Sequence, residues 1–270
     1  MKKNVFARIF GDAFLAVVLC VLYMPIVLII VFSFSGNSMF VFSDGFTLSS
    51  YAEIFTSPKT ALLLEALKTT LIIATVSSIV STILGTVSAV GIHYLSPRIK
   101  KLTLAVNQLP MINSEIVLAV SLMIFFATVN FIPAGYAQLI ISHIAFCTPY
   151  VILSIMPKLA QMDPNMYEAA LDLGATPFKA MTKVVFPYIM PGIISGFVMA
   201  FTISMDDFVI TQMNKGDSGL NTLSTYIYSD ARVGGLEPFW FAVFSIFFVV
   251  VLTVLLFSNL KKSTNGEGNK

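Results

Sequence analysis

Six long apolar runs dominate the chain, and each is long enough to cross a lipid bilayer as a helix. A hydrocarbon core of about 30 Å takes roughly 20 mainly apolar residues in helical form, whereas β-barrel strands alternate over about ten residues. The runs cover residues 13–34, 69–93, 103–129, 135–156, 188–211 and 239–260. This pattern predicts an all-α integral membrane protein, in which residues 1–270 form a single domain with six transmembrane helices.

The composition fits a lipid environment. Apolar residues make up 57% of the chain, charged residues only 11%, and the mean hydropathy is +0.87. A soluble domain does not keep so much apolar surface in water, so we expect membrane lipid around the helices. The net charge is only +2, and nothing in it indicates binding to nucleic acid.

Lys and Arg collect in alternate loops, which sets the predicted orientation. One set of loops and termini holds Lys2, Lys3, Arg8, Arg98, Lys100, Lys101, Lys158, Lys179, Lys183, Lys261, Lys262 and Lys270. The other set holds only Lys59, Lys68, Lys215 and Arg232. Because positive charge concentrates on the cytoplasmic side of membrane proteins, both termini are predicted to lie in the cytoplasm.

The predicted cytoplasmic loop at residues 157–187 is too regular for a simple connection. Asp163-Pro164 and Thr176-Pro177 each offer a helix cap followed by a first-turn proline, and Gly174 breaks the chain between them. This pattern predicts two short helices. A docking surface for a soluble partner is one interpretation, and a cap on the membrane bundle is the other.

The residues of this loop resemble a known motif. Glu168-Ala169-Ala170, Gly174 and Val184-Val185-Phe186-Pro187 follow the spacing EAA-x3-G-x9-I-x-L-P, which is the EAA loop of ABC importer permeases. Val184 and Phe186 replace the usual Ile and Leu but stay apolar. The resemblance implies the type I ABC importer permease fold and a helix that couples to an ATPase subunit. The coupling residues that it implies are Glu168, Ala169, Ala170, Gly174 and Pro187.

Three stretches narrow the resemblance. Residues 142–147, 168–175 and 201–207 look like the spermidine/putrescine permeases of this family, and most like the second of their two membrane subunits. The resemblance implies polyamine import across the bacterial cytoplasmic (inner) membrane, with ATP hydrolysed in another subunit. The partners that it implies are a homodimer of ATP-binding subunits, a second homologous permease subunit and an extracytoplasmic substrate-binding protein.

Three acidic residues, Glu115, Asp206 and Asp207, lie inside predicted spans. Each costs about 2.5 to 3.5 kcal/mol at a helix centre, so such residues are usually functional. No Lys or Arg lies well inside a predicted span, so a path lined by these acids would attract cations. Alternatively, the adjacent aspartates cap a broken helix or bond to a neighbouring span. Consecutive residues point about 100° apart on a helix, so the two aspartates face different directions and need not share a role. We assign Asp206 to the path and Asp207 to a structural or gating contact.

Other polar and small residues in the spans are interpreted as packing. His143 in the fourth span is read as a hydrogen-bond donor between helices, with a proton relay as the alternative. Ser77, Ser81, Gly85 and Ala89 form a small-residue seam along the second span.

Several catalytic motifs are missing from the sequence. It has no G-x4-G-K-[ST] phosphate loop, no H-E-x-x-H and no nucleophile elbow, so we expect no ATP hydrolysis, no catalytic residue, no metal ligand and no cofactor in this chain. An ion-driven secondary transporter is the alternative class, although no inverted repeat is visible. If the chain is an ABC importer permease, the alternative to a polyamine substrate is another small cation or a metal.

Overall fold

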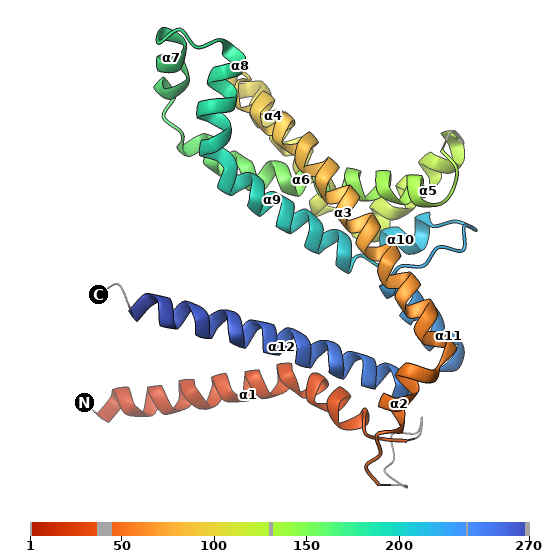
Figure 1. Cartoon of the computed structure of the whole chain (residues 1–270). Helices are drawn as coiled ribbons and strands as arrows, with labels where there is room; N and C mark the ends of the chain where they lie inside the picture. Colours follow the sequence, from red (N-terminus) through yellow and green to blue (C-terminus); the bar gives the residue numbers. More distant parts are fainter. Residues whose placement is uncertain (1, 37–44, 130–131, 236, 268–270) are drawn as a thin grey trace. The chain divides into compact units, whose positions relative to one another are not determined.

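The computed structural model describes residues 2–36, 45–129, 132–235 and 237–267, and every regular element within them is a helix. The elements, labelled in Figure 1, are α1 (Lys2–Phe32), α2 (Ser49–Thr56), α3 (Pro58–His93), α4 (Pro97–Ile112), α5 (Glu115–Val129), α6 (Tyr136–Gln161), α7 (Asn165–Asp172), α8 (Pro177–Ala180), the π-helix η1 (Met181–Val185), α9 (Phe186–Asp206), α10 (Val209–Asn214), α11 (Leu223–Gly234) and α12 (Pro238–Glu267). The expected all-α class is confirmed. Lys270, one of the residues used for the orientation, lies outside the described residues.

The chain divides into two compact units, and the first combines Met1–Leu62 with Ile227–Lys270. Within it the end of α1 packs against the start of α12, where the ring centroids of Phe32 and Phe241 are 6.4 Å apart. The first turn of α3 is held by ion pairs from Lys59 Nζ to Asp230 Oδ2 at 3.0 Å and Glu237 Oε2 at 2.6 Å. These contacts join segments from both ends of the chain.

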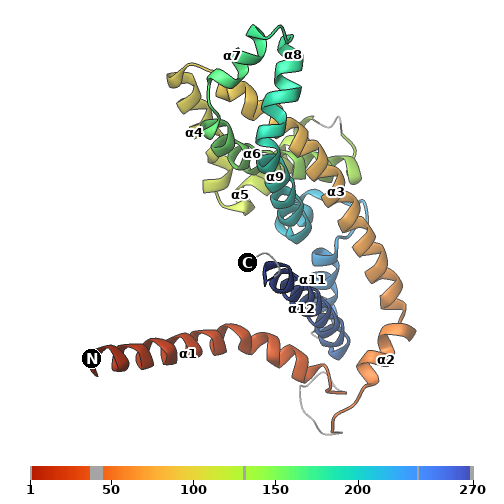
Figure 2. The same ribbon diagram turned by 60° about the vertical axis from the view of Figure 1, so that its left-hand side comes forward.

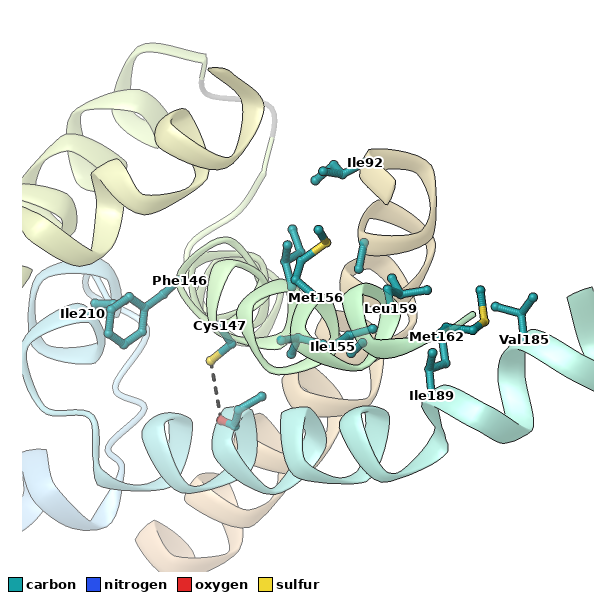
Figure 3. Packing of buried hydrophobic residues seen from close by; sticks show 14 of the residues in the cluster. Ile92, Phe146, Cys147, Ile155, Met156, Leu159, Met162, Val185, Ile189 and Ile210 are labelled. Atoms are coloured by element: carbon teal, nitrogen blue, oxygen red, sulfur yellow. Dashed lines mark hydrogen bonds between the residues drawn. The ribbon is translucent and has the colours of Figure 1, made fainter. Parts of the chain in front are cut away.

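The second unit, Leu63–Tyr226, has its apolar core between α6 and α9 (Figure 3). Its fully buried members include Val151, Ile155, Leu159, Ile189 and Ala200. Gly196 lets the two backbones approach, because a Cβ there would lie 3.1 Å from Val151 Cγ1. Cys147 Sγ donates to the carbonyl oxygen of Ala200 at 3.5 Å across the same interface.

The predicted small-residue seam of α3 packs against α6, as expected. Ser77 and Ser81 are fully buried and donate to the carbonyl oxygens of Ile140 and Ile144. A Cβ at Gly85 would lie only 2.6 Å from Val151 Cγ1. The seam is therefore a packing surface on which α6 lies close to α3.

Among the described residues, four segments are long and apolar enough to cross a membrane: Phe10–Phe32, Pro58–His93, Tyr136–Gln161 and Pro177–Asp206. Pro97–Ile112 and Glu115–Val129 pass the same test as a pair that is bent by 99°. The described apolar part of α12 is the shorter segment Pro238–Thr253. Each of the runs recognised in the sequence falls on one of these segments.

Two of the six predicted spans are broken in the structure. The third run bends at Asn113, whose backbone is extended (φ −70°, ψ 152°). Pro110, one turn earlier, has no N–H to donate and so weakens the end of α4. The fifth run was expected to extend to residue 211, but α9 ends at Asp206.

Candidate functional site

The break at the end of α9 is organised by Asp207. Its backbone is extended (φ −62°, ψ 133°), and its side chain caps the short helix α10 that follows. Oδ1 accepts from the backbone N–H of Ile210 at 3.0 Å, and Oδ2 accepts from the backbone N–H of Thr211 at 2.9 Å and from its hydroxyl at 2.7 Å. An aspartate that supplies acceptors to the next turn favours a new helix start over a continuing helix, which is why the predicted span ends early.

An acidic pocket of about 290 Å³ opens at this break. Its lining residues are Glu115, Thr202, Ile203, Asp206, Asp207, Phe208 and Val209. The three predicted acids therefore meet in one place, although Glu115 comes from the start of α5 and the aspartates from the end of α9. The lining contains no Lys or Arg.

The three carboxyl groups differ in their surroundings. Asp206 is exposed and Glu115 is half-buried, whereas Asp207 is only 5% exposed. The carboxyl group of Glu115 interacts with both aspartates. A cation placed among the three groups would offset their mutual repulsion, so the pocket is suited to a positively charged ligand.

Behind the pocket, His143 of α6 contacts both sides of the break. Its Nδ1 lies 2.8 Å from Ser204 Oγ and its Nε2 lies 3.1 Å from Thr211 Oγ1, and all three side chains are buried. The interpretation of His143 as a bridge between helices is confirmed. The roles of Ser204 and Thr211 as hydrogen-bond partners of His143 were not predicted, because nothing in the sequence shows which polar residues a buried imidazole contacts.

Of the two short helices that the sequence predicts in the loop between α6 and α9, α7 stands alone, whereas α8 continues through η1 into α9 as one helical segment, Pro177–Asp206. Asp163 Oδ1 accepts from the Asn165 N–H at 2.9 Å, and Thr176 Oγ1 accepts from the Lys179 N–H at 3.4 Å. Gly174 ends the α7 region with a φ of +82°, and its N–H donates to the Leu171 carbonyl at 2.8 Å. The loop is a locally capped structure, as predicted.

Most of the expected coupling residues are exposed. Glu168, Ala169, Gly174 and Pro187 are exposed, and Ala170 is half-buried. Beside them, Leu173 and Phe178 are two large apolar side chains of the same loop that are 88% and 77% exposed. Leu173 and Phe178 were not among the predicted coupling residues. Large apolar side chains in a polar loop are a sequence signal that could have indicated them.

The other side of the loop is anchored to the core of the second unit. Tyr167 packs against the buried cluster, and its ring centroid lies 5.9 Å from that of Tyr94, just after α3. Burial, with a smaller contribution from Tyr167, raises the pKa of the Tyr94 hydroxyl, so this hydroxyl is uncharged at neutral pH. Figures 1 and 2 both show α7 and α8 at one end of the α6 and α9 pair. The acidic pocket lies at the other end of α9.

Similar solved structures define the fold. The fold matches a chain of a bacterial alginate ABC transporter with a TM-score of 0.65 at 18% identity, covering 96% of this chain and 94% of that one. It also matches a chain of the MetNI methionine ABC transporter with a TM-score of 0.57 at 18% identity, covering 77% and 96%. The chain therefore has the fold of an ABC transporter membrane subunit, and the expected type I permease fold is confirmed.

The sequence matches the family described as binding-protein-dependent transport system inner membrane component over residues 81–265, and the chain belongs to this family. It is 32% identical over 262 residues to the spermidine/putrescine transport system permease protein PotC of Escherichia coli K12, covering 97% of both chains. It is 31% identical to PotC of Haemophilus influenzae over 256 residues, covering 95% and 97%. It is 32% identical to the putrescine transport system permease protein PotI of E. coli K12 over 219 residues, covering 79% and 76%.

The resemblance seen in the loop is thus confirmed. The chain is a multi-pass inner-membrane permease subunit of the ABC transporter class, and its family is one of transport rather than of catalysis.

Proposed function

We propose that this chain is a permease subunit of an ATP-driven importer that moves spermidine or putrescine across the cytoplasmic membrane. The observation that carries the proposal is the pocket in which Glu115, Asp206 and Asp207 meet without any Lys or Arg in the lining. The relatives PotC and PotI are named as permeases for spermidine/putrescine and for putrescine. Both substrates are cations, which is consistent with a pocket lined by acidic groups.

The chemistry of a polyamine fits such a pocket. Each ammonium group that leaves water must regain its lost hydration, and a carboxylate does so through a charge-assisted hydrogen bond. The thin apolar chain between the ammonium groups needs only apolar lining, which Ile203, Phe208 and Val209 supply. Asp206 and Glu115 are the groups that we assign to the substrate, and Asp207 is the structural member.

Several partners are part of the proposal. The chain acts as one permease domain of residues 1–270 with six spans and both termini in the cytoplasm, beside a second homologous permease subunit. The loop at residues 157–187 docks on one copy of a homodimeric ATP-binding subunit, through Glu168, Ala169, Ala170, Gly174 and Pro187. An extracytoplasmic binding protein delivers the substrate, and ATP is hydrolysed in the partner. The exposed side chains of Leu173 and Phe178 support a docking role, because a partner surface would cover them.

Another small cation is the competing substrate. A metal ion fits less well, because the described residues hold no group of three or more His, Cys, Asp and Glu side chains arranged to bind one. An ion-driven secondary transporter would leave the capped loop and its exposed apolar residues without a partner.

Co-purification followed by an ATPase assay tests the proposal. The tagged chain is purified with the subunits that accompany it, reconstituted in lipid with the binding protein, and supplied with ATP. Spermidine or putrescine should stimulate ATP hydrolysis, whereas an amino acid, a sugar and a divalent metal should not. Purification without an ATPase subunit would contradict the transporter class, and stimulation by the metal alone would contradict the polyamine substrate.

A further inference from the structure

His143 is a buried group that the proposed path does not use directly. None of its side chain is exposed, yet both ring nitrogens have partners on other elements. Nδ1 contacts Ser204 in the last turn of α9, and Nε2 contacts Thr211 in α10. One imidazole on α6 therefore holds the two helices that flank the break at Asp207.

The hydrogen bonds around this ring have a definite direction. The Thr211 hydroxyl has a single hydrogen, which it donates to Asp207 Oδ2 at 2.7 Å. Thr211 Oγ1 can therefore only accept from His143 Nε2, so that nitrogen holds the proton. In the neutral ring Nδ1 is then an acceptor, which the Ser204 hydroxyl fills. The chain of donors runs from Ser204 through His143 and Thr211 to the Asp207 carboxylate.

Asp207 is fully engaged in this arrangement. Its two oxygens accept from two backbone N–H groups and the Thr211 hydroxyl, and His143 Nε2 lies 3.5 Å from Oδ2. A substrate ammonium would have to displace these donors, which are the cap of α10. Asp207 therefore holds the pocket in shape, while the adjacent Asp206 also lines the pocket and is exposed.

A second anchor ties α10 to the helix that bears Glu115. Asn214 is fully buried, and its Nδ2 donates to the carbonyl oxygen of Ala119 on α5 at 3.1 Å. The short helix α10 is thus fixed to α6 through His143 and to α5 through Asn214. Glu115 on α5 and Asp206 on α9 line the same pocket, and each of their helices is held by one of these anchors.

We propose that His143 is a positioning residue for substrate selection: acting through Thr211 and Asp207, it fixes the spacing of the two carboxylates that bind the ammonium groups. The inference rests on the proposed function of the pocket. Spermidine contains the diamine of putrescine and adds a third ammonium group at a shorter spacing, so a change in the spacing of the carboxylates changes how well each substrate fits. A change at His143 should alter that preference rather than only lower the rate.

Variants at two positions separate positioning from folding. His143→Asn places an amide near Nδ1 and keeps only the contact with Ser204, whereas His143→Gln reaches the position of Nε2 and keeps the contact with Thr211. Thr211→Val removes the hydroxyl between His143 and Asp207, and Thr211→Ser restores it. Ser142→Ala is the matched control, because Ser142 is equally buried but donates only to Gln138 of its own helix.

The measurement is the ratio of spermidine to putrescine uptake by the whole complex in proteoliposomes, with saturating loaded binding protein and ATP. His143→Asn and Thr211→Val should change this ratio by about threefold or more, the effect of a small loss of complementarity at one ammonium. His143→Gln, Thr211→Ser and Ser142→Ala should keep the wild-type ratio. A merely structural defect would lower both uptakes in proportion.

An unchanged ratio in both His143→Asn and Thr211→Val would overturn the positioning role, whatever the absolute rates. If His143→Asn does not assemble, the Thr211→Val and Thr211→Ser pair decides by the same criterion. Uptake by Glu115→Gln and Asp206→Asn, measured alongside, separates a failure of the positioning role of His143 from a failure of the function proposed for the pocket. If they lower uptake while the ratio stays fixed in the other variants, only the positioning role fails. If they transport at wild-type rates, the function proposed for the pocket fails.

Discussion

The two ends of α9 use their polar residues in opposite ways. At one end, the loop of α7 and α8 presents Glu168 and two large apolar side chains to the outside and holds its shape with local caps. At the other end, Asp207 and His143 are buried and bonded across α6, α9 and α10. The helix between them has 21 residues and so spans about 30 Å.

This difference separates two kinds of functional residue. A side chain on the loop should matter for what it contacts in a partner, and its loss should leave the fold intact. A side chain behind the pocket should matter for the geometry that it maintains, and its loss should cost stability as well. The following variants test that division.

The largest expected effect on transport is at Glu168. Glu168→Lys should reduce uptake to background, because a reversed charge on an exposed docking helix would repel the partner surface that accepts the acid. Membrane insertion and the thermal stability of the chain should stay at wild-type values. Uptake is measured in cells, and association with the ATPase subunit is measured by co-purification. Normal uptake by the Glu168→Lys variant would remove the main support for docking at this loop. Uptake by Glu168→Gln should lie between that of the wild type and that of Glu168→Lys.

The largest expected effect on stability is at Asp207. Asp207→Ala should lower the stability of the permease by about 1 to 3 kcal/mol, because it leaves the buried donors of Ile210 and Thr211 without their acceptor. Thermal denaturation of the purified complex measures the loss. Asp206→Ala is the matched control and should melt like the wild type, since Asp206 is exposed. Equal melting temperatures for Asp207→Ala and Asp206→Ala would contradict the assignment of a structural role to Asp207 alone.

A smaller effect is expected at Gly174, whose φ of +82° is unfavourable for a side chain. Gly174→Val should strain the loop by about 1 to 2 kcal/mol, although no atom lies within 4 Å of the added Cβ. Gly174→Asn should be tolerated, because Asn enters the left-handed region readily. Limited proteolysis of the loop compares the two variants, and equal cleavage would show that the turn is not under this constraint.

The smallest effect on the fold is expected at Phe178, which is 77% exposed. Phe178→Ser should change stability by no more than about 0.5 kcal/mol, as for other surface substitutions, yet it should weaken association with the ATPase subunit. The melting temperature and the salt resistance of the complex are the two measurements. Unchanged association would mean that the apolar surface of the loop faces no partner.

The loop was predictable because its signals are local. Asp163, Thr176 and Gly174 act on residues within one turn, so their spacing alone predicted α7 and the helix start at Pro177. The spacing did not show that α8 continues into α9. The apolar runs were predictable for a similar reason, since a membrane span is recognised by its own length and composition.

The pocket was predictable only in its acids. The sequence showed that Glu115, Asp206 and Asp207 are exceptional in apolar runs, and a cap on a broken helix, which is what Asp207 forms, was only the alternative interpretation of the aspartates. That break depends on Thr211 and on His143, which is more than 60 residues away in the chain. The bend at Asn113 likewise places Glu115 at the start of a new helix instead of inside a continuous one.

The central claim, that the acidic pocket is the path of a polyamine, is tested most directly by spermidine uptake through Asp206→Asn and Glu115→Gln. Both substitutions keep the shape of the side chain and remove its charge, so assembly with the ATPase subunit should survive. Uptake should fall by roughly 10-fold to 150-fold, which corresponds to one charge-assisted contact of about 1.5 to 3 kcal/mol. Wild-type uptake by both variants across a range of spermidine concentrations would contradict the claim.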